Sequence, residues 1–218
     1  ALHGLFISLR ITSNRLGVFI PEISTETVIW THAEQIMDEE IRWWENDDGT
    51  GTSWTDHVVN SDLAGAIYSC CDDIDGDGDL DILGAGSIDS QYVWWENDDG
   101  TGTSWTEHII ADSYPKVRVI FTCDMDLDDD VDVLVFGKTY DDITWLENSD
   151  GSGTSWIEHP VTDNFSGAYC ISAEDIDGDG DIDVMASGFS EGAIAWWEND
   201  DGSGTSWTHH TIATLPVA

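Results

Sequence analysis

The chain has 218 residues and carries 45 Asp plus Glu against 6 Lys plus Arg, which gives a formal net charge of −39. A compact chain with this charge repels itself unless cations neutralise part of it. The same charge disfavours nucleic acid and anionic membranes as partners, and the lack of any run of 18 apolar residues argues against membrane insertion. High acidity is typical of disordered segments, but the 12 Trp and the 40% hydrophobic composition favour a folded core.

A repeat of 51 residues organises the chain. Each copy contains the sequence WWEN or WLEN, then a Ser-Trp pair, then a histidine three residues after that tryptophan. The first tryptophan of WWEN or WLEN recurs at Trp43, Trp94, Trp145 and Trp196. The Ser-Trp tryptophan recurs at Trp54, Trp105, Trp156 and Trp207, and the histidine at His57, His108, His159 and His210. A fixed period of this length indicates a solenoid, a propeller or an array.

The later copies also contain an Asp-rich loop, which starts at Asp73, Asp124 and Asp175. The first copy departs from this pattern, because the loop is due at position 22 and the chain reads EISTETVIWT there. The segment can be encoded by a DNA sequence that reads DIDGDGDLD when it is shifted by one base. Our hypothesis is that roughly residues 1–37 are a frameshifted blade, natural or from sequence assembly, with ordinary divergence as the alternative. As written, Glu22, Thr25 and Glu26 do not form a calcium site. The chain begins at Ala1 without Met or a recognisable secretory signal, so we interpret it as a processed form or a fragment.

The second copy, residues 63–111, illustrates the expected strands. AGAIYSCCDD, DILGAG, QYVWWEN and SWTEHIIA read as four short strands, and the Asp-Gly turns between them are typical of hairpins. Helical periodicity is absent, which excludes solenoids of helix pairs. We therefore predict an all-β chain, a β-propeller of about four four-stranded blades, which forms a single propeller domain or propeller fragment over 1–218. The expected blades are approximately 13–60, 63–111, 114–162 and 165–213.

An acidic loop of nine residues follows the first strand of the second, third and fourth copies. Clustered carboxylates repel each other without a cation, and calcium takes six to eight oxygen ligands, which makes it a better candidate than magnesium. We expect side-chain ligands at loop positions 1, 3, 5 and 9 and a backbone ligand at position 7, for up to three calcium ions per chain. The first loop supplies Asp73, Asp75, Asp77, Asp81 and the carbonyl of Asp79. The last supplies Asp175, Asp177, Asp179, Asp183 and the carbonyl of Asp181.

The middle loop, DMDLDDDVD, has lost both glycines, to Leu127 and Asp129. Asp tolerates the left-handed backbone region better than most residues do, so we expect a site here that is weaker than the other two. Its ligands are Asp124, Asp126, Asp128, Asp132 and the carbonyl of Asp130. A solvated acidic turn without metal is the alternative for all three loops.

The sequence DIDGDGDLDILGAG, followed by VWWENDDGTG, resembles the FG-GAP or VCBS repeats of secreted bacterial proteins. Integrin α-subunit propellers and a fungal propeller lectin that binds N-acetylglucosamine are similar. The resemblance covers residues 41–213 and implies an extracellular or cell-surface propeller, stabilised by calcium and used in adhesion or carbohydrate binding. Such propellers usually have seven blades, so four copies suggest a fragment, a four-bladed ring, or chains that pool their blades.

The repeated tryptophans have two interpretations. Packing between blades is one, because large flat side chains fill the wedge between twisted sheets. Stacking platforms for sugar rings are the other, and since neighbouring strand positions face opposite ways, one member of each pair could be more exposed. On the second interpretation the candidate ligand-binding residues are Trp44, Trp95 and Trp197, with Leu146 replacing the tryptophan in the third copy.

No nonrepeated constellation of catalytic residues is recognisable, so we do not expect an enzyme. The repeated histidines lie on separate strands and are expected to make structural hydrogen bonds. Expected partners are glycans or extracellular and cell-surface proteins, and a homo-oligomer could complete a propeller or a filament. The alternative function is a structural scaffold that assembles into rings or filaments without a small-molecule ligand. The cysteines occupy different repeat positions and are expected to be small buried residues, with one disulfide as the alternative: Cys70, Cys71, Cys123 and Cys170.

Overall fold

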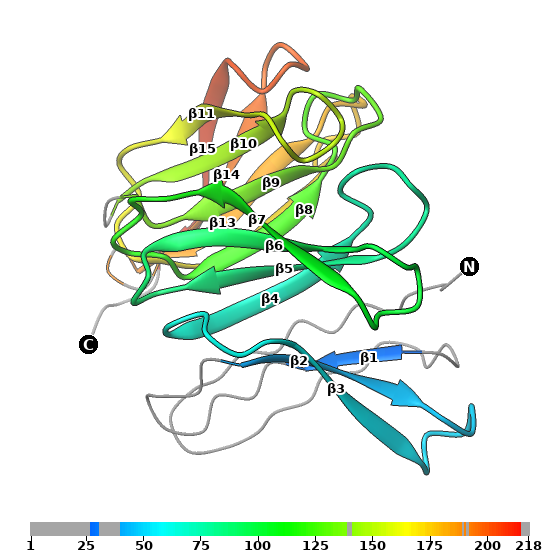
Figure 1. Ribbon diagram of the computed structural model, residues 1–218. Helices are drawn as coiled ribbons and strands as arrows, with labels where there is room; N and C mark the ends of the chain where they lie inside the picture. The colour runs from blue at the N-terminus through cyan, green and yellow to red at the C-terminus, as the bar shows by residue number, and fades with distance from the viewer. Residues whose placement is uncertain (1–26, 31–39, 139–140, 189, 191, 215–218) are drawn as a thin grey trace.

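The computed structural model describes residues 27–30, 40–138, 141–188, 190 and 192–214. These residues form fifteen strands and no helix, so the described part contains no helix that could cross a membrane. The strands make four antiparallel sheets in which chain neighbours pair (Figure 1). The predicted all-β class with repeated propeller-type blades is confirmed.

Each sheet is a meander whose strands follow the chain. The first sheet consists of β1 (Thr27–Trp30), β2 (Ile41–Asn46) and β3 (Trp54–Asn60). The second consists of β4 (Ala66–Asp72), β5 (Asp81–Gly86), β6 (Gln91–Asn97) and β7 (Trp105–Ala111). The third consists of β8 (Val119–Cys123), β9 (Asp132–Phe136), β10 (Ile143–Asn148) and β11 (Trp156–Thr162). The fourth consists of β12 (Ala168–Glu174), β13 (Asp183–Gly188), β14 (Ala193–Asn199) and β15 (Trp207–Thr214).

The first sheet differs from the others in register. β1 pairs with β2 where β5 pairs with β6, but Val28 lies opposite Trp44, whereas the repeat would place residue 31 there because Ile82 lies opposite Trp95. The register between β1 and β2 is therefore shifted by three residues from the register that the repeat predicts. Residues 1–26 and 31–39, which hold most of the proposed frameshifted segment, lie outside the described residues. The expected acidic loop falls on residues 22–30, so only its last four positions are described, and these form β1.

The blades stack through three hydrophobic clusters, one between each pair of successive sheets. The first cluster joins Trp43 to Trp95, the second joins Trp94 to Leu146, and the third joins Trp145 to Trp197. The first aromatic of each WW or WL pair therefore faces the following blade, and the second residue faces the preceding one. This is the alternation that a strand imposes, with both faces buried because each inner sheet lies between two others. Among the first strands of these sheets, β8 contacts both β4 and β12.

A tryptophan hydrogen bond fixes the spacing between successive blades. The indole N–H of Trp94 donates to the carbonyl of Gly153 in the next sheet at 3.1 Å, and Trp156 donates to the same carbonyl at 2.9 Å. A β-carbon placed at Gly153 would lie 2.5 Å from the Trp94 ring, so only glycine lets the indole approach this closely. Equivalent bonds join Trp43 and Trp105 to Gly102, and Trp145 and Trp207 to Gly204.

The repeated histidines have a structural role, as expected. The His108 ring stacks on Trp94 with a centroid separation of 4.5 Å, and its Nε2 lies 2.9 Å from a carboxylate oxygen of Glu96. The other three copies repeat this arrangement with the glutamate of WWEN or WLEN. The four cysteines are free thiols, without the alternative disulfide. The expectation that they are buried is correct for Cys71 and wrong for the others, because Cys70 and Cys123 are half-buried and Cys170 is exposed.

Candidate metal centres

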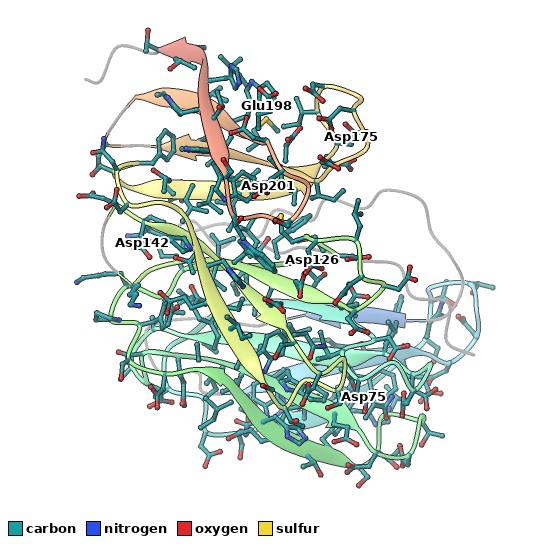
Figure 2. The ribbon with its side chains drawn as sticks, turned by 90° about the horizontal axis from the view of Figure 1, so that it is seen from above. Asp75, Asp126, Asp142, Asp175, Glu198 and Asp201 are labelled. Carbon is teal, nitrogen blue, oxygen red and sulfur yellow. The ribbon has the colours of Figure 1, made fainter. Side chains whose placement is uncertain are left out.

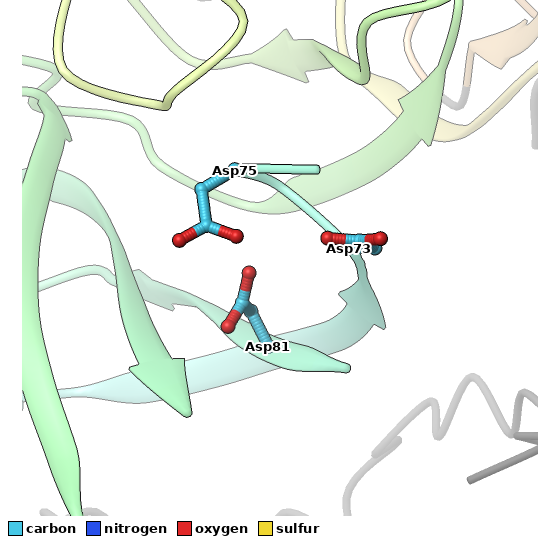
Figure 3. Close-up of side chains that lie close together, drawn as sticks. All are labelled: Asp73, Asp75 and Asp81. Carbon is cyan, nitrogen blue, oxygen red and sulfur yellow. The ribbon is translucent and has the colours of Figure 1, made fainter. Parts of the chain in front are cut away.

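Each acidic loop brings three carboxylates together. In the second sheet, Asp73, Asp75 and Asp81 offer oxygens that lie within 4.8 Å of one another. Figure 3 shows these three side chains around a common space between the start of the loop and the start of β5. The third and fourth sheets repeat the cluster with Asp124, Asp126 and Asp132, and with Asp175, Asp177 and Asp183. These are the residues predicted at loop positions 1, 3 and 9.

The aspartate at position 9 anchors the loop to the sheet. Asp81 is buried, and its two carboxylate oxygens accept backbone hydrogen bonds from Ile74 and Asn97, both at 2.9 Å. Asp132 and Asp183 make the equivalent pairs of bonds. Each carboxylate oxygen keeps a second lone pair, so this residue can close the loop and still ligate a cation.

Two carboxylate oxygens in the clusters are buried without a hydrogen-bond partner, namely Oδ1 of Asp73 and Oδ1 of Asp126. A buried carboxylate oxygen without a partner costs free energy unless a cation or a donor reaches it. Burial raises the pKa of Asp81 and of Asp132 to about 7, and the neighbouring aspartates add to this rise. The orphaned oxygens, the clustered charge and the all-oxygen donor set fit a hard divalent cation.

The residues predicted at positions 5 and 7 lie outside the three-carboxylate clusters. The position 5 side chain accepts a hydrogen bond from the backbone N–H of position 7, as in Asp77 and Asp79 at 2.9 Å. The same bond joins Asp128 to Asp130 and Asp179 to Asp181. These side chains shape the loop in the structure, and calcium ligation by Asp77, Asp128 and Asp179 stays a prediction.

The middle loop keeps the fold of its neighbours despite losing its glycines. Gly76 and Gly78 have φ of 72° and 96°, and the equivalent residues Leu127 and Asp129 have φ of 62° and 73°. A β-carbon at either glycine would meet no atom within 4 Å, so side chains fit in the available space. The cost of the substitution therefore lies in the left-handed backbone alone, which is about 1–2 kcal/mol for a residue such as Leu.

We expect Leu127→Gly to raise the stability of the chain by about 1 kcal/mol, because glycine adopts this conformation without a steric penalty. Calcium affinity of the middle loop should rise in parallel. Denaturant unfolding with and without calcium measures both effects, and Leu80→Gly, a change outside the left-handed positions, serves as the control. A loss of stability in the Leu127 variant as large as that in the control would contradict this account of the loop.

Two of the acidic loops also contact the following blade. Ile74, at position 2 of its loop, is buried in the second cluster, and its carbonyl accepts a hydrogen bond from the Asn148 side chain of the third sheet at 2.9 Å. Met125, at position 2 of the middle loop, is buried in the third cluster. Figure 2 shows Asp75, Asp126 and Asp175 along one side of the molecule. Ordering a loop therefore also orders the contact between two sheets.

Two of the three candidate sugar platforms lie in the core. Trp95 and Trp197 are buried between blades, and Leu146 fills the equivalent place in the third sheet. These positions present no ring face to solvent. Trp44 is half-buried. The tryptophans of the Ser-Trp pairs also reach the surface, because Trp54 is exposed and its three equivalents are half-buried.

The comparisons with known proteins agree with this geometry. Two overlapping segments, residues 73–135 and 124–186, match the FG-GAP-like repeat family, and together they span more than half of the chain. Each match begins at the first aspartate of an acidic loop and ends in the second strand of the next sheet. No curated protein and no solved structure matches the chain. With its acidic loops, its repeated meanders and this match, the chain belongs to the FG-GAP-like repeat family.

Proposed function

We propose that this chain is an extracellular or cell-surface propeller unit that calcium stabilises, with up to three ions per chain. The observation that carries the proposal is the set of three equivalent Asp clusters, two of which hold a buried carboxylate oxygen without a partner. Calcium suits these clusters better than magnesium, because it accepts irregular all-oxygen cages and gives up its water more readily.

Calcium in this role supplies positive charge and ties the loop closed. Asp73 and Asp75 would hold the ion from the start of the loop, and Asp81 would hold it from β5 while it anchors the backbone. The ion also offsets part of the net charge of −39, which otherwise opposes a compact state. Since Ile74 and Met125 pack against the next sheet, the ions favour stacking of the blades.

The calcium-bound unit binds carbohydrate or takes part in adhesion and has no catalytic activity. The Ser-Trp tryptophans support this role, because each stands at the surface beside a turn rich in Asp, Ser and Thr. These turns are preorganised. For example, Asp150 accepts hydrogen bonds from the Thr154 hydroxyl and the backbone of Ser152, and the Thr154 bond is the main cause that lowers its pKa to about 2. An indole face beside fixed polar groups is suited to a pyranose ring.

We expect the protein to bind glycans on an array in the presence of calcium, and Trp156→Ala to weaken binding at least severalfold, because the sugar loses its stacking surface. Ile157→Ala is the matched control, since Ile157 is the exposed neighbour on the opposite face of β11. Melting temperatures of both variants separate lost binding from lost folding. The absence of reproducible glycan binding by the wild type would rule out the carbohydrate role.

The alternative is a structural scaffold that assembles into rings or filaments. One observation favours it: the fourth sheet exposes large apolar side chains. Contiguous exposed apolar surface commonly marks an interaction site.

A further inference from the structure

The fourth sheet carries an apolar face that is exposed in the described structure. Ile176, Met185 and Ile212 have exposed fractions of 39%, 38% and 54%. They come from the metal loop, from β13 and from β15, and the half-buried Trp196 of β14 belongs to the same face. We call these four residues the terminal apolar face.

The equivalent residues in the two preceding sheets show what kind of surface this face is. Residues 51 positions earlier are Met125, Leu134, Trp145 and Val161, and all four are buried in the cluster between the third and fourth sheets. Residues 102 positions earlier are Ile74, Leu83, Trp94 and Ile110, and all four are buried in the cluster between the second and third sheets. The terminal apolar face is therefore a blade-stacking surface, and no sheet follows β15 within the described residues.

Trp196 has the orientation of a donor, but no glycine carbonyl equivalent to the acceptors of Trp43, Trp94 and Trp145 receives it among the described residues. Its ring stacks on His210 with a centroid separation of 4.4 Å and an interplanar angle of 16°, the same values that relate Trp145 to His159. Trp145 donates its indole N–H to a glycine carbonyl of the following sheet, whereas Trp196 has no such bond within the described part of the chain.

The matching acceptor is present at the other end of the chain. By the repeat, the glycine that would receive Trp196 corresponds to Gly51, in the turn between β2 and β3. This turn has the internal bonds of its equivalents, because Gly51 N–H donates to the Asn46 side chain at 3.1 Å and Trp54 donates to the Gly51 carbonyl at 3.0 Å. Gly51 is exposed, whereas Gly102, Gly153 and Gly204 are buried.

The slot above Gly51 is also open. A β-carbon built at Gly51 meets only the Trp54 ring, at 3.7 Å, whereas one built at Gly102 lies 2.6 Å from the Trp43 ring of the preceding sheet. Trp43 fills the space over Gly102, whereas no described residue fills the equivalent space over Gly51. Trp54 is exposed, as expected of an acceptor turn without its donor blade.

We propose that the terminal apolar face of one copy of this chain docks on the first sheet of a second copy, with the Trp196 indole N–H donating to the Gly51 carbonyl of that second copy. The contact is heterologous, and two such contacts would close a ring of two copies if the rotation between the copies is 180°, whereas another rotation would give a larger ring or an open filament. Four sheets from each copy would make eight blades, which is within the range of known propellers. The inference rests on the proposed scaffold assembly, and it requires neither sugar binding nor a particular number of calcium ions.

A second copy is the occupant that the structure supports, because its first sheet offers the glycine, the turn and the open slot. The equivalents of the terminal apolar face meet such a glycine and turn three times within the chain. The net charge of −39 on each copy opposes the contact. Screening by salt weakens this repulsion, so association should strengthen as ionic strength rises.

Sedimentation velocity of the 218-residue chain in calcium buffer tests the proposal. We expect a species of twice 24.0 kDa that grows with protein concentration and with salt. Trp196→Ala and Ile212→Ser should each weaken association at least tenfold. Ile109→Ser is the control, because Ile109 is 56% exposed on β7 but lies outside the clusters between blades, and it should leave association unchanged.

Circular dichroism melts of the dilute variants check that each is folded. Larger open assemblies that Trp196→Ala disperses would also support the contact. A wild type that stays monomeric at every concentration and salt would overturn it, and would assign the face to another segment or partner. Equal weakening by Ile212→Ser and Ile109→Ser would overturn it as well. Glycan binding or a calcium-dependent melt by a monomeric wild type would leave the proposed calcium and sugar roles standing while this inference fails.

Discussion

Removal of calcium is expected to lower the melting temperature of this protein by about 15–30 °C. A ligand that binds only the folded state at 100 times its dissociation constant stabilises that state by about 2.7 kcal/mol per site. Three equivalent sites would therefore contribute roughly 8 kcal/mol, and 1 kcal/mol shifts the melting temperature of a chain of this size by about 2–4 °C. Thermal melts in millimolar calcium and in excess EDTA measure the difference.

Two controls separate this effect from general ionic strength. Excess calcium added after EDTA should restore the original melting temperature, whereas magnesium at the same concentration should restore much less, because an irregular all-protein cage suits it poorly. Equal melting temperatures in calcium and EDTA would contradict the metal assignment for all three clusters.

Trp94→Ala is expected to lower the free energy of unfolding by about 3–5 kcal/mol, the usual cost of deleting a large buried aromatic side chain. Trp94 is fully buried between the second and third sheets and donates to the Gly153 carbonyl. Its loss opens a cavity at the contact between two blades and leaves that carbonyl with one donor instead of two. Denaturant unfolding followed by circular dichroism measures the change.

The chain supplies its own matched control in Trp196→Ala. Trp196 occupies the same position of the repeat and stacks on the equivalent histidine, His210, but it has no following sheet within the described residues. The change should cost only about 1 kcal/mol when the protein is dilute, since a half-buried side chain leaves no closed cavity. Comparable losses in the two variants would show that stacking between blades contributes little to stability.

Much of the fold follows from the period of 51 residues. Because Trp94 and its equivalents recur without insertion, the sequence predicts equivalent sheets, and three complete meanders are present at that spacing. The carboxylate clusters were also predictable at loop positions 1, 3 and 9, since alternate aspartates around flexible glycines can converge. The conformation of the middle loop, with Leu127 and Asp129 at positive φ, follows from the same equivalence.

Other features depend on how the sheets stack. Strand alternation predicts that Trp94 and Trp95 face opposite ways. It does not predict that neighbouring sheets cover both faces, and for this reason Trp95 was also a candidate platform. The exposure of Met185 also depends on stacking, because Leu134, its equivalent in the third sheet, is just as apolar but is covered by the next sheet. The exposure of Met185 could have been predicted from its place in the fourth repeat, which no further repeat follows in this sequence. The out-of-step register of Val28 arises from a segment that does not follow the repeat.

The most direct test of calcium-bound blades is a count of ions. Equilibrium dialysis of the folded protein against calcium, followed by elemental analysis, should give three ions per chain at saturation. The double variant Asp73→Asn, Asp75→Asn should give two, because it removes two carboxylates from one cluster and leaves the loop anchor Asp81 in place. A wild-type count of zero, or a count that the double variant leaves unchanged, would contradict the account.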